Sequence, residues 1–129
     1  MKKEFVPYEQ ALELKQLGFN EECFSYYTYP EGKFSNVLSF NSYKNTALKT
    51  SSPTFSQAFK WFRENYGLES SIVFHENYSY QGKTNVYETN IEKRGENSRY
   101  FFTPIEGFIT YEEAELECLK KLIEIVKSK

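Results

Sequence analysis

The side chains able to do acid–base or nucleophilic chemistry are few in this sequence and far apart. His75 is the only histidine, and it lies beside Phe74 in an alternating stretch, residues 70–80. A Ser-His-Asp triad or a Cys-His pair would have to use this histidine. Its position inside a predicted strand, facing away from Phe74, is typical of an exposed strand histidine. The sequence therefore predicts no catalytic centre.

Metal ligands and acid–base pairs are equally poorly represented. Cys23 and Cys118 have no metal-like spacing, and with one histidine they supply too few ligands for a zinc site. We expect two reduced, partly buried thiols, as in a cytosolic protein. The chain has no aspartate, and its glutamates gather at predicted helix starts and surfaces, as at Glu112-Glu113. No glycine pattern matches a phosphate-binding loop. We therefore expect no enzyme, no metal and no cofactor.

Aromatic residues are the chain's most unusual feature, at 19% of its composition. On a sheet, such rings could stack nucleic-acid bases. A net charge of −2 gives no electrostatic basis for holding a phosphate backbone, however. Packing in the core and on the sheet is the favoured interpretation, and the same rings also suit a protein interface. The rings considered for base stacking are Tyr78, Tyr80, Tyr87, Tyr100 and Phe102.

Five residues form the candidate interaction surface. Trp61 lies off the main apolar stripe of its predicted helix, so it either packs inward or is an exposed anchor. Tyr26, Tyr27 and Tyr29 share one predicted strand, of which only one side can face the core. Arg99 opens the last predicted strand.

Three helices are expected to position these residues. Residues 53–67 carry an apolar face and end at a glycine, with either Thr54 or Ser52 as the N-cap. A second helix lies within residues 5–19, and a third follows Thr110, which opens a T-x-x-E capping box. The expected buried face of the third helix comprises Ala114, Cys118, Leu119, Leu122, Ile123 and Val126. The expected apolar face of the central helix comprises Phe55, Ala58, Phe59, Phe62 and Tyr66.

The strands complete an α+β fold. Residues 23–29 and 34–40 predict a hairpin, and residues 41–52 a polar loop or a frayed extension of it. Residues 70–80, 85–93 and 99–103 predict an antiparallel meander of three strands. We expect one domain over residues 1–129. Its parts are the N-terminal helix and hairpin (1–40), the loop (41–52) and an α-β-β-β-α core (53–129).

No apolar run approaches the length of a membrane span, and the basic start MKKEFVPYEQ lacks the apolar segment of a secretory signal. The sequence thus predicts a cytoplasmic protein without a membrane partner.

The order and length of residues 54–127 resemble those of the double-stranded RNA-binding domain, which implies a helix, three strands and a helix. In that family, lysines at the start of the last helix hold phosphates, and the loop between the first two strands carries a Gly-Pro-x-His-like motif. Here the last helix opens with TYEEAE, and the loop at residues 81–84 reads QGKT. The resemblance supports a shape and counts against RNA binding.

Three further blocks are FVPYEQALELKQLGF, QAFKWFRENYGL and YEEAELECLKKLIEIVK. They resemble a family of small uncharacterised proteins from gut anaerobes and from their phages and mobile elements. The resemblance implies a phage or prophage accessory protein and no particular activity.

The leading hypothesis is a non-enzymatic module that binds protein, with a homodimer through an aromatic surface as one form. A second hypothesis is nucleic-acid binding through the sheet, with Lys83, Arg94 and Arg99 as contacts. A third is a small enzyme that uses Glu and Tyr groups, although the sequence gives no reason to expect the cleft it would need.

Overall fold

The computed structural model contains three helices and two antiparallel sheets, which confirms the α+β class. The chain divides into two compact units, residues 1–58 and 59–129, and each is described by itself. The prediction of a single domain stays a prediction. The structure describes residues 4–28, 31–36, 45, 49–75, 86–95, 99–102, 108 and 110–128, with the backbone alone at 36 and 99–102.

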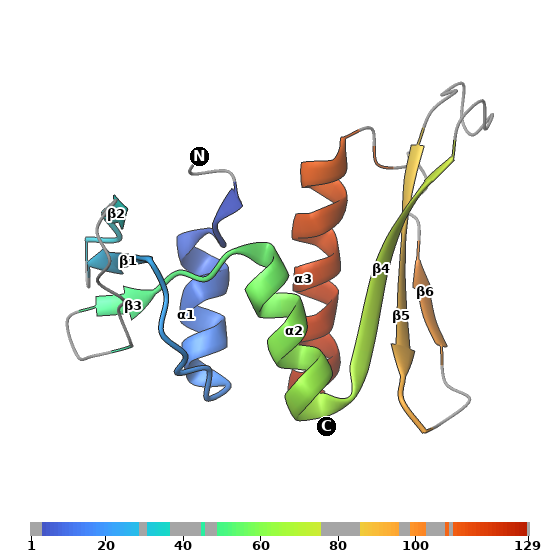
Figure 1. Cartoon of the computed structure of the whole chain (residues 1–129), viewed down its shortest axis with the longest axis horizontal. Coiled ribbons are helices and arrows are strands. Elements are labelled where there is room, and N and C mark those ends of the chain that lie inside the picture. The colour runs from blue at the N-terminus through green and yellow to red at the C-terminus, as the bar shows by residue number, and fades with distance from the viewer. Residues whose placement is uncertain are drawn as a thin grey trace. The chain divides into compact units, whose positions relative to one another are not determined.

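Helix α1 (Tyr8–Gln16) opens the first unit, as the sequence predicts (Figure 1). Its C-terminal end is a Schellman motif, in which Phe19 N–H donates to Leu14 O at 2.9 Å and Gly18 N–H donates to Lys15 O at 3.1 Å. Gly18 has a φ of 102°, which a residue with a Cβ adopts only under strain. The motif turns Phe19 back into the core, where the ring is buried.

The first unit also contains a small antiparallel sheet in the order β2-β1-β3. The pairing of β1 (Ser25–Thr28) with β2 (Phe34–Asn36) confirms the predicted hairpin. Strand β3 (Lys49–Ser51) lies in the stretch that was predicted to be a polar loop or a frayed extension of the hairpin, and it pairs with β1. Thr50 and Ser51 are buried there, so pairing with β1 decides the conformation of a segment that has no apolar alternation.

A buried polar network joins the parts of the first unit around the main chain of Val6. The Val6 carbonyl accepts from Tyr27 OH at 3.0 Å and from Ser52 Oγ at 2.9 Å. Val6 N–H donates to Pro53 O at 2.9 Å. The Tyr8 ring packs against the Tyr27 ring, with their centroids 5.2 Å apart. Because these groups satisfy one another, buried hydroxyls cost this core little.

Helix α2 (Phe55–Tyr66) is the predicted central helix, and the boundary between the two units falls within it. Thr54 Oγ1 accepts from Gln57 N–H at 3.2 Å, so Thr54 is the N-cap and Ser52 is not. The helix ends at Gly67, which has a φ of 66°. Phe55, Ala58 and Phe62 of the expected apolar face are buried, and Phe59 and Tyr66 are half-buried.

The second unit contains the predicted meander as an antiparallel sheet in the order β4-β5-β6 (Figure 1). Its strands are β4 (Leu68–His75), β5 (Val86–Lys93) and β6 (Arg99–Phe102). Strand β4 begins at Leu68, two residues before the predicted start, because Gly67 turns the chain from helix directly into strand. The predicted strand residues 76–80 and the first turn at 81–83 lie outside the described residues.

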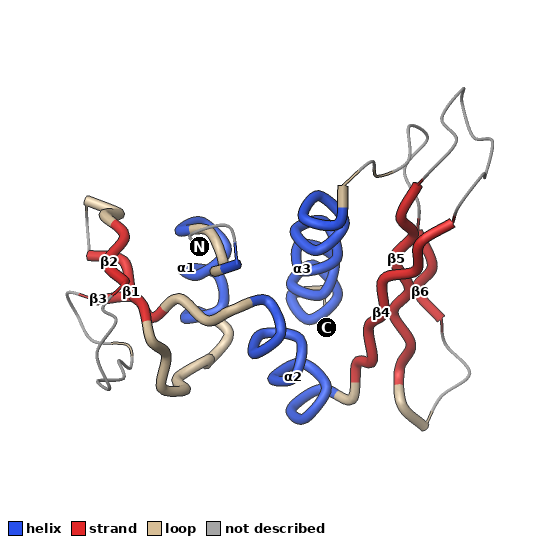
Figure 2. Tube along the Cα trace, turned by 45° about the horizontal axis from the view of Figure 1, so that its top comes forward, coloured by secondary structure: helices blue, strands red, loops and turns tan. Residues whose placement is uncertain are grey.

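Helix α3 (Tyr111–Lys127) lies along one face of this sheet, beside β4 and β5 (Figures 1 and 2). Thr110 Oγ1 accepts from Glu113 N–H at 3.1 Å, which confirms the predicted cap. The expected buried face is confirmed with one exception. Val126 is half-buried and Ile125 is buried in its place, because Ile125 continues the line of Cys118 and Leu122 along the helix.

Replacing Thr110 by Ala should lower the free energy of unfolding by about 1 kcal/mol, because the Glu113 N–H then loses its side-chain acceptor. Thr110→Ser keeps the hydroxyl and should stay near the wild-type value. Urea denaturation followed by circular dichroism measures both. Equal destabilisation by the two substitutions would show that the hydroxyl is not the stabilising group.

Candidate interaction surface

Three aromatic side chains of the second unit form a continuous group that reaches solvent. Phe74 on β4 is 49% exposed, and Tyr111 at the start of α3 is 45% exposed. Tyr87 on β5 lies between them and is half-buried. Its ring centroid is 5.0 Å from that of Phe74 and 5.8 Å from that of Tyr111. We call these three residues the 74/87/111 ring cluster.

The cluster lies at one end of the core that is formed between the sheet and α3. Tyr87 shares a strand face with Thr89 and Ile91, both of which are buried. Tyr111 lies one turn before Ala114 on the buried side of α3. The helix begins at Tyr111, so the core closes on these rings without a further helical turn to cover them. The rings are held by the same packing that holds the core.

On the opposite face of the sheet the described side chains are mostly polar, with Val73 exposed and Val86 buried among them. Val73 is 40% exposed. The imidazole Nε2 of His75 is in hydrogen-bonding contact with the Glu88 carboxylate, and Glu92 is exposed. In Figures 1 and 2, no described helix covers this face within the second unit. The pairing of His75 with Glu88 gives the histidine a structural partner on the strand next to it.

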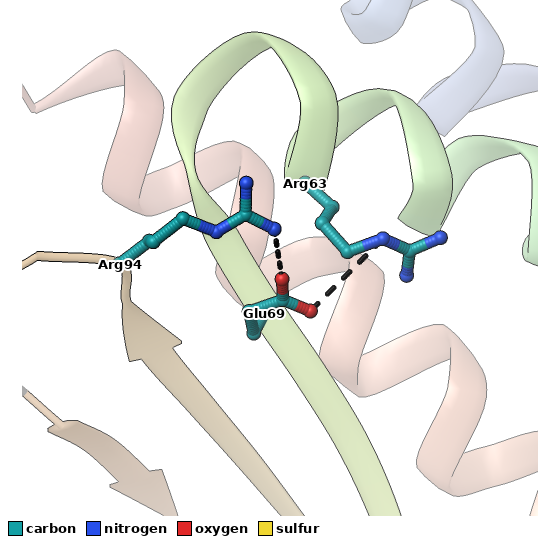
Figure 3. A network of polar contacts seen from close by, with 3 residues as sticks. All are labelled: Arg63, Glu69 and Arg94. Carbon is teal, nitrogen blue, oxygen red and sulfur yellow. Dashed lines mark hydrogen bonds and ion pairs between the residues drawn. The ribbon is translucent and has the colours of Figure 1, made fainter.

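A charged network holds the junction between α2 and β4 (Figure 3). Glu69 lies between two arginines: it forms an ion pair with Arg94, and its other carboxylate oxygen is 4.0 Å from Arg63 Nε. Lys93 Nζ donates to the Tyr66 carbonyl in the last turn of α2. A positive charge at this end of a helix interacts favourably with the helix dipole. The three side chains of the network are substantially exposed, so their ion pairs add little stability.

Two of the predicted surface residues are buried. Trp61 is 6% exposed, and its ring makes edge contacts with Phe62 and Tyr66 at centroid distances of 5.1 and 5.4 Å. It lies three residues after Ala58, so the apolar arc of α2 is wider than the stripe read from the sequence. Tyr27 is 3% exposed and bonds to Val6. Neither ring is an exposed anchor.

The remaining candidates lie elsewhere. Tyr26 is half-buried on the other side of β1, and Lys49 Nζ lies over its ring, 4.7 Å from the centroid. Tyr29 lies outside the described residues. The backbone of Arg99 pairs with Glu92 at the start of β6, and its side chain is not described. Of the five predicted residues, the structure thus describes the side chains of Trp61, Tyr26 and Tyr27, and two of these are buried.

The 74/87/111 ring cluster was not predicted. Phe74 was expected on the apolar face of its strand and Tyr87 among the sheet rings, and neither was linked to Tyr111. A usable signal was present, because Tyr111 is three residues before Ala114 and seven before Cys118. Such spacing puts an aromatic residue at the open end of the buried helix face.

Both thiols are buried, and their acidity differs from that of free cysteine. Burial raises the pKa of the Cys23 thiol from its ordinary 9.0 to about 11, although hydrogen bonds from Ser51 and Gln57 act in the opposite direction. Burial likewise raises the pKa of Cys118 from 9.0 to about 12, against a hydrogen bond with Ser70. Since the thiolate is the reactive form, neither cysteine is suited to nucleophilic chemistry.

Among the described residues, no group of three or more His, Cys or Glu side chains could hold a metal ion. No helix in the described part of the chain is long and apolar enough to cross a membrane. Comparisons of the chain with protein-family models, curated proteins and solved structures gave no match. Function must therefore be argued from the surfaces of the molecule itself.

The native protein should react with a thiol reagent at about pH 8 far more slowly than the unfolded protein, in which both thiols are accessible. Stability should also fall as pH rises from 9.0 towards 11. In that window the unfolded chain has lost thiol protons that the folded chain still holds. Thiol titration with and without denaturant measures the first effect, and urea midpoints across the pH range measure the second. Rapid modification of the folded protein would contradict the burial of these residues.

Proposed function

We propose that this protein is a non-enzymatic protein-interaction module that binds its partner through the 74/87/111 ring cluster. One observation carries the proposal: Phe74 and Tyr111 are each about half exposed, yet Tyr87 holds them together in one contiguous aromatic group. Aromatic residues are enriched among those that dominate binding energy at protein interfaces.

The physical gain from covering the cluster is appreciable. Full burial of a Phe side chain stabilises by about 1.5–3 kcal/mol, so covering the exposed half of one ring contributes on the order of 1 kcal/mol. The tyrosine hydroxyls can keep a polar partner at the rim while their rings are covered. Because core packing already orders these rings, they lose little conformational entropy when a partner covers them.

Nucleic-acid binding through the sheet has less support. Arg94, one of its predicted contacts, is paired with Glu69. The sheet face opposite α3 carries Glu88 and Glu92, whose charges repel phosphates. Lys83 lies outside the described residues. We therefore favour a protein partner.

The setting we propose is the cytoplasm, as an accessory protein of a phage or mobile element. This part of the proposal rests on the three sequence blocks described above and on their resemblance to uncharacterised proteins of gut anaerobes and their phages.

Photo-crosslinking tests the proposed surface. A benzoylphenylalanine side chain at position 74 should give an adduct of discrete mass in cells that make the protein, because a partner covers that ring. Position 24 is the matched control, since Phe24 is a phenylalanine of the first unit that is 61% exposed and in no ring contact that the structure describes. Tyr111→Ser, added to the position 74 probe, should weaken the adduct several-fold.

Equal adducts from positions 74 and 24, or none from position 74, would contradict the proposal. The adduct's mass also distinguishes a second copy of the chain from a different protein.

A further inference from the structure

Strand β4 is an edge strand, and it is eight residues long. Among the described strands it pairs with β5 alone, over its whole length from Leu68 to His75. An edge strand presents a row of backbone N–H and C=O groups that can pair with another strand. The pairing of β4 with β5 shows which residues of β4 point their backbone groups to the free side.

The outward-facing residues of β4 follow from one hydrogen bond. Tyr87 N–H donates to Phe108 O at 2.8 Å, so the polar backbone groups of Tyr87 point away from β4. Backbone direction alternates along a strand, so Glu88 and Asn90 point towards β4. Their partners are Val73 and Ser71, whose backbone groups therefore face β5.

The backbone groups of Ser70, Ile72 and Phe74 consequently point to the free side of β4. Among the described residues, none of these groups has a backbone hydrogen-bond partner. A three-residue row of donors and acceptors is thus open for pairing.

Residues 70–74 carry none of the sequence features that keep edge strands from pairing. Natural edges carry lysines, prolines, bulges or very short strands. Between Ser70 and Phe74 the sequence reads SSIVF, with no charge, proline or glycine. The register with β5 runs without interruption through the strand, so there is no bulge. Val73 and Phe74 add exposed apolar surface beside the open backbone groups.

The same strand is complementary to itself when two copies run antiparallel about a two-fold axis at Ile72. Each Glu69 then lies opposite His75 of the other copy, so that a carboxylate faces an imidazole. Each Phe74 lies opposite Ser70, whose small side chain leaves room for the ring. No two like charges lie opposite each other, which a paired sheet requires.

Neighbouring charges extend this match. Within one copy Glu69 is paired with Arg94, and His75 is paired with Glu88. The two-fold arrangement brings Glu69 of one copy beside His75 of the other. The resulting row runs Arg94, Glu69, His75, Glu88, so that each carboxylate lies beside a guanidinium or an imidazole across the junction. An isologous contact of this kind closes on itself and gives a dimer and not a fibre.

We propose that the partner is a second copy of this chain, and that two β4 strands pair antiparallel about Ile72 to join two β4-β5-β6 sheets into one. The inference rests on the proposed function, because the 74/87/111 ring cluster lies beside this edge and would border the same interface.

Sedimentation velocity on the full chain tests the dimer. The wild type should shift from monomer to dimer as its concentration rises. Ile72→Pro should stay monomeric, because it removes the outward N–H at the centre of the pairing, while an edge strand tolerates proline at such a position. Ile72→Val is the matched control, since it keeps the N–H and the β-branched side chain, and it should dimerise. A wild type that is monomeric at every concentration, or an Ile72→Pro variant that dimerises like the wild type, would overturn the proposal.

A disulfide trap tests the register independently, without a proline. Ser71 and Val73 of the two copies lie opposite each other in a non-hydrogen-bonded pair, where Cα atoms are about 4.5 Å apart and a disulfide can close. On oxidation, a mixture of Ser71→Cys and Val73→Cys chains should form a covalent dimer in much higher yield than either variant alone. Cys23 and Cys118 are buried and should not compete. Equal yields in all three samples would overturn the register.

The two proposals can fail separately. A monomeric wild type that still gives a Tyr111-dependent adduct at position 74 with a protein of another mass would leave the proposed function standing and remove self-pairing. Absence of any adduct together with dimerisation through β4 would do the reverse.

Discussion

The packing of α3 on one face of the β4-β5-β6 sheet is the contact on which the second unit depends. A three-stranded sheet has two faces and two edges, and α3 covers one face. Its line of buried residues faces Thr89 and Ile91 of the central strand β5. A single helix cannot also cover the far face or the outer strands. The 74/87/111 rings and the edge of β4 therefore remain exposed, because the second unit packs only this one helix on the sheet.

The interior of the first unit is filled partly by polar groups. Its small sheet supplies few large aliphatic side chains, and hydroxyls occupy part of the interior. Ser25 Oγ donates to Ser52 O at 2.8 Å, and Ser52 Oγ donates to Val6 O at 2.9 Å, so these buried hydroxyls are satisfied. The Thr50 hydroxyl is the exception, because it is buried with no hydrogen-bond partner in the part of the chain that the structure describes.

Local signals made the helices predictable, and longer-range pairing made much of the rest unpredictable. Thr110 and Gly18 act through groups within a few residues, so the sequence alone indicates where α3 begins and α1 ends. Strand β3 has no such signal, because it depends on β1 and on the Asn45 side chain, which accepts from Ser51 N–H at 2.8 Å. The 74/87/111 ring cluster was missed for a related reason. Tyr111 is recognised as part of it only when the distance between Tyr111 and Tyr87 is known.

The most direct measurement is amide hydrogen exchange, resolved by residue along β4, at low and high protein concentration. The Ser71 and Val73 amides should exchange slowly at both concentrations, because they are bonded to β5. The Ile72 amide should exchange fast in dilute solution and slowly in concentrated solution, where the second copy accepts a hydrogen bond from it. An Ile72 amide that exchanges equally fast at both concentrations would contradict pairing through this edge.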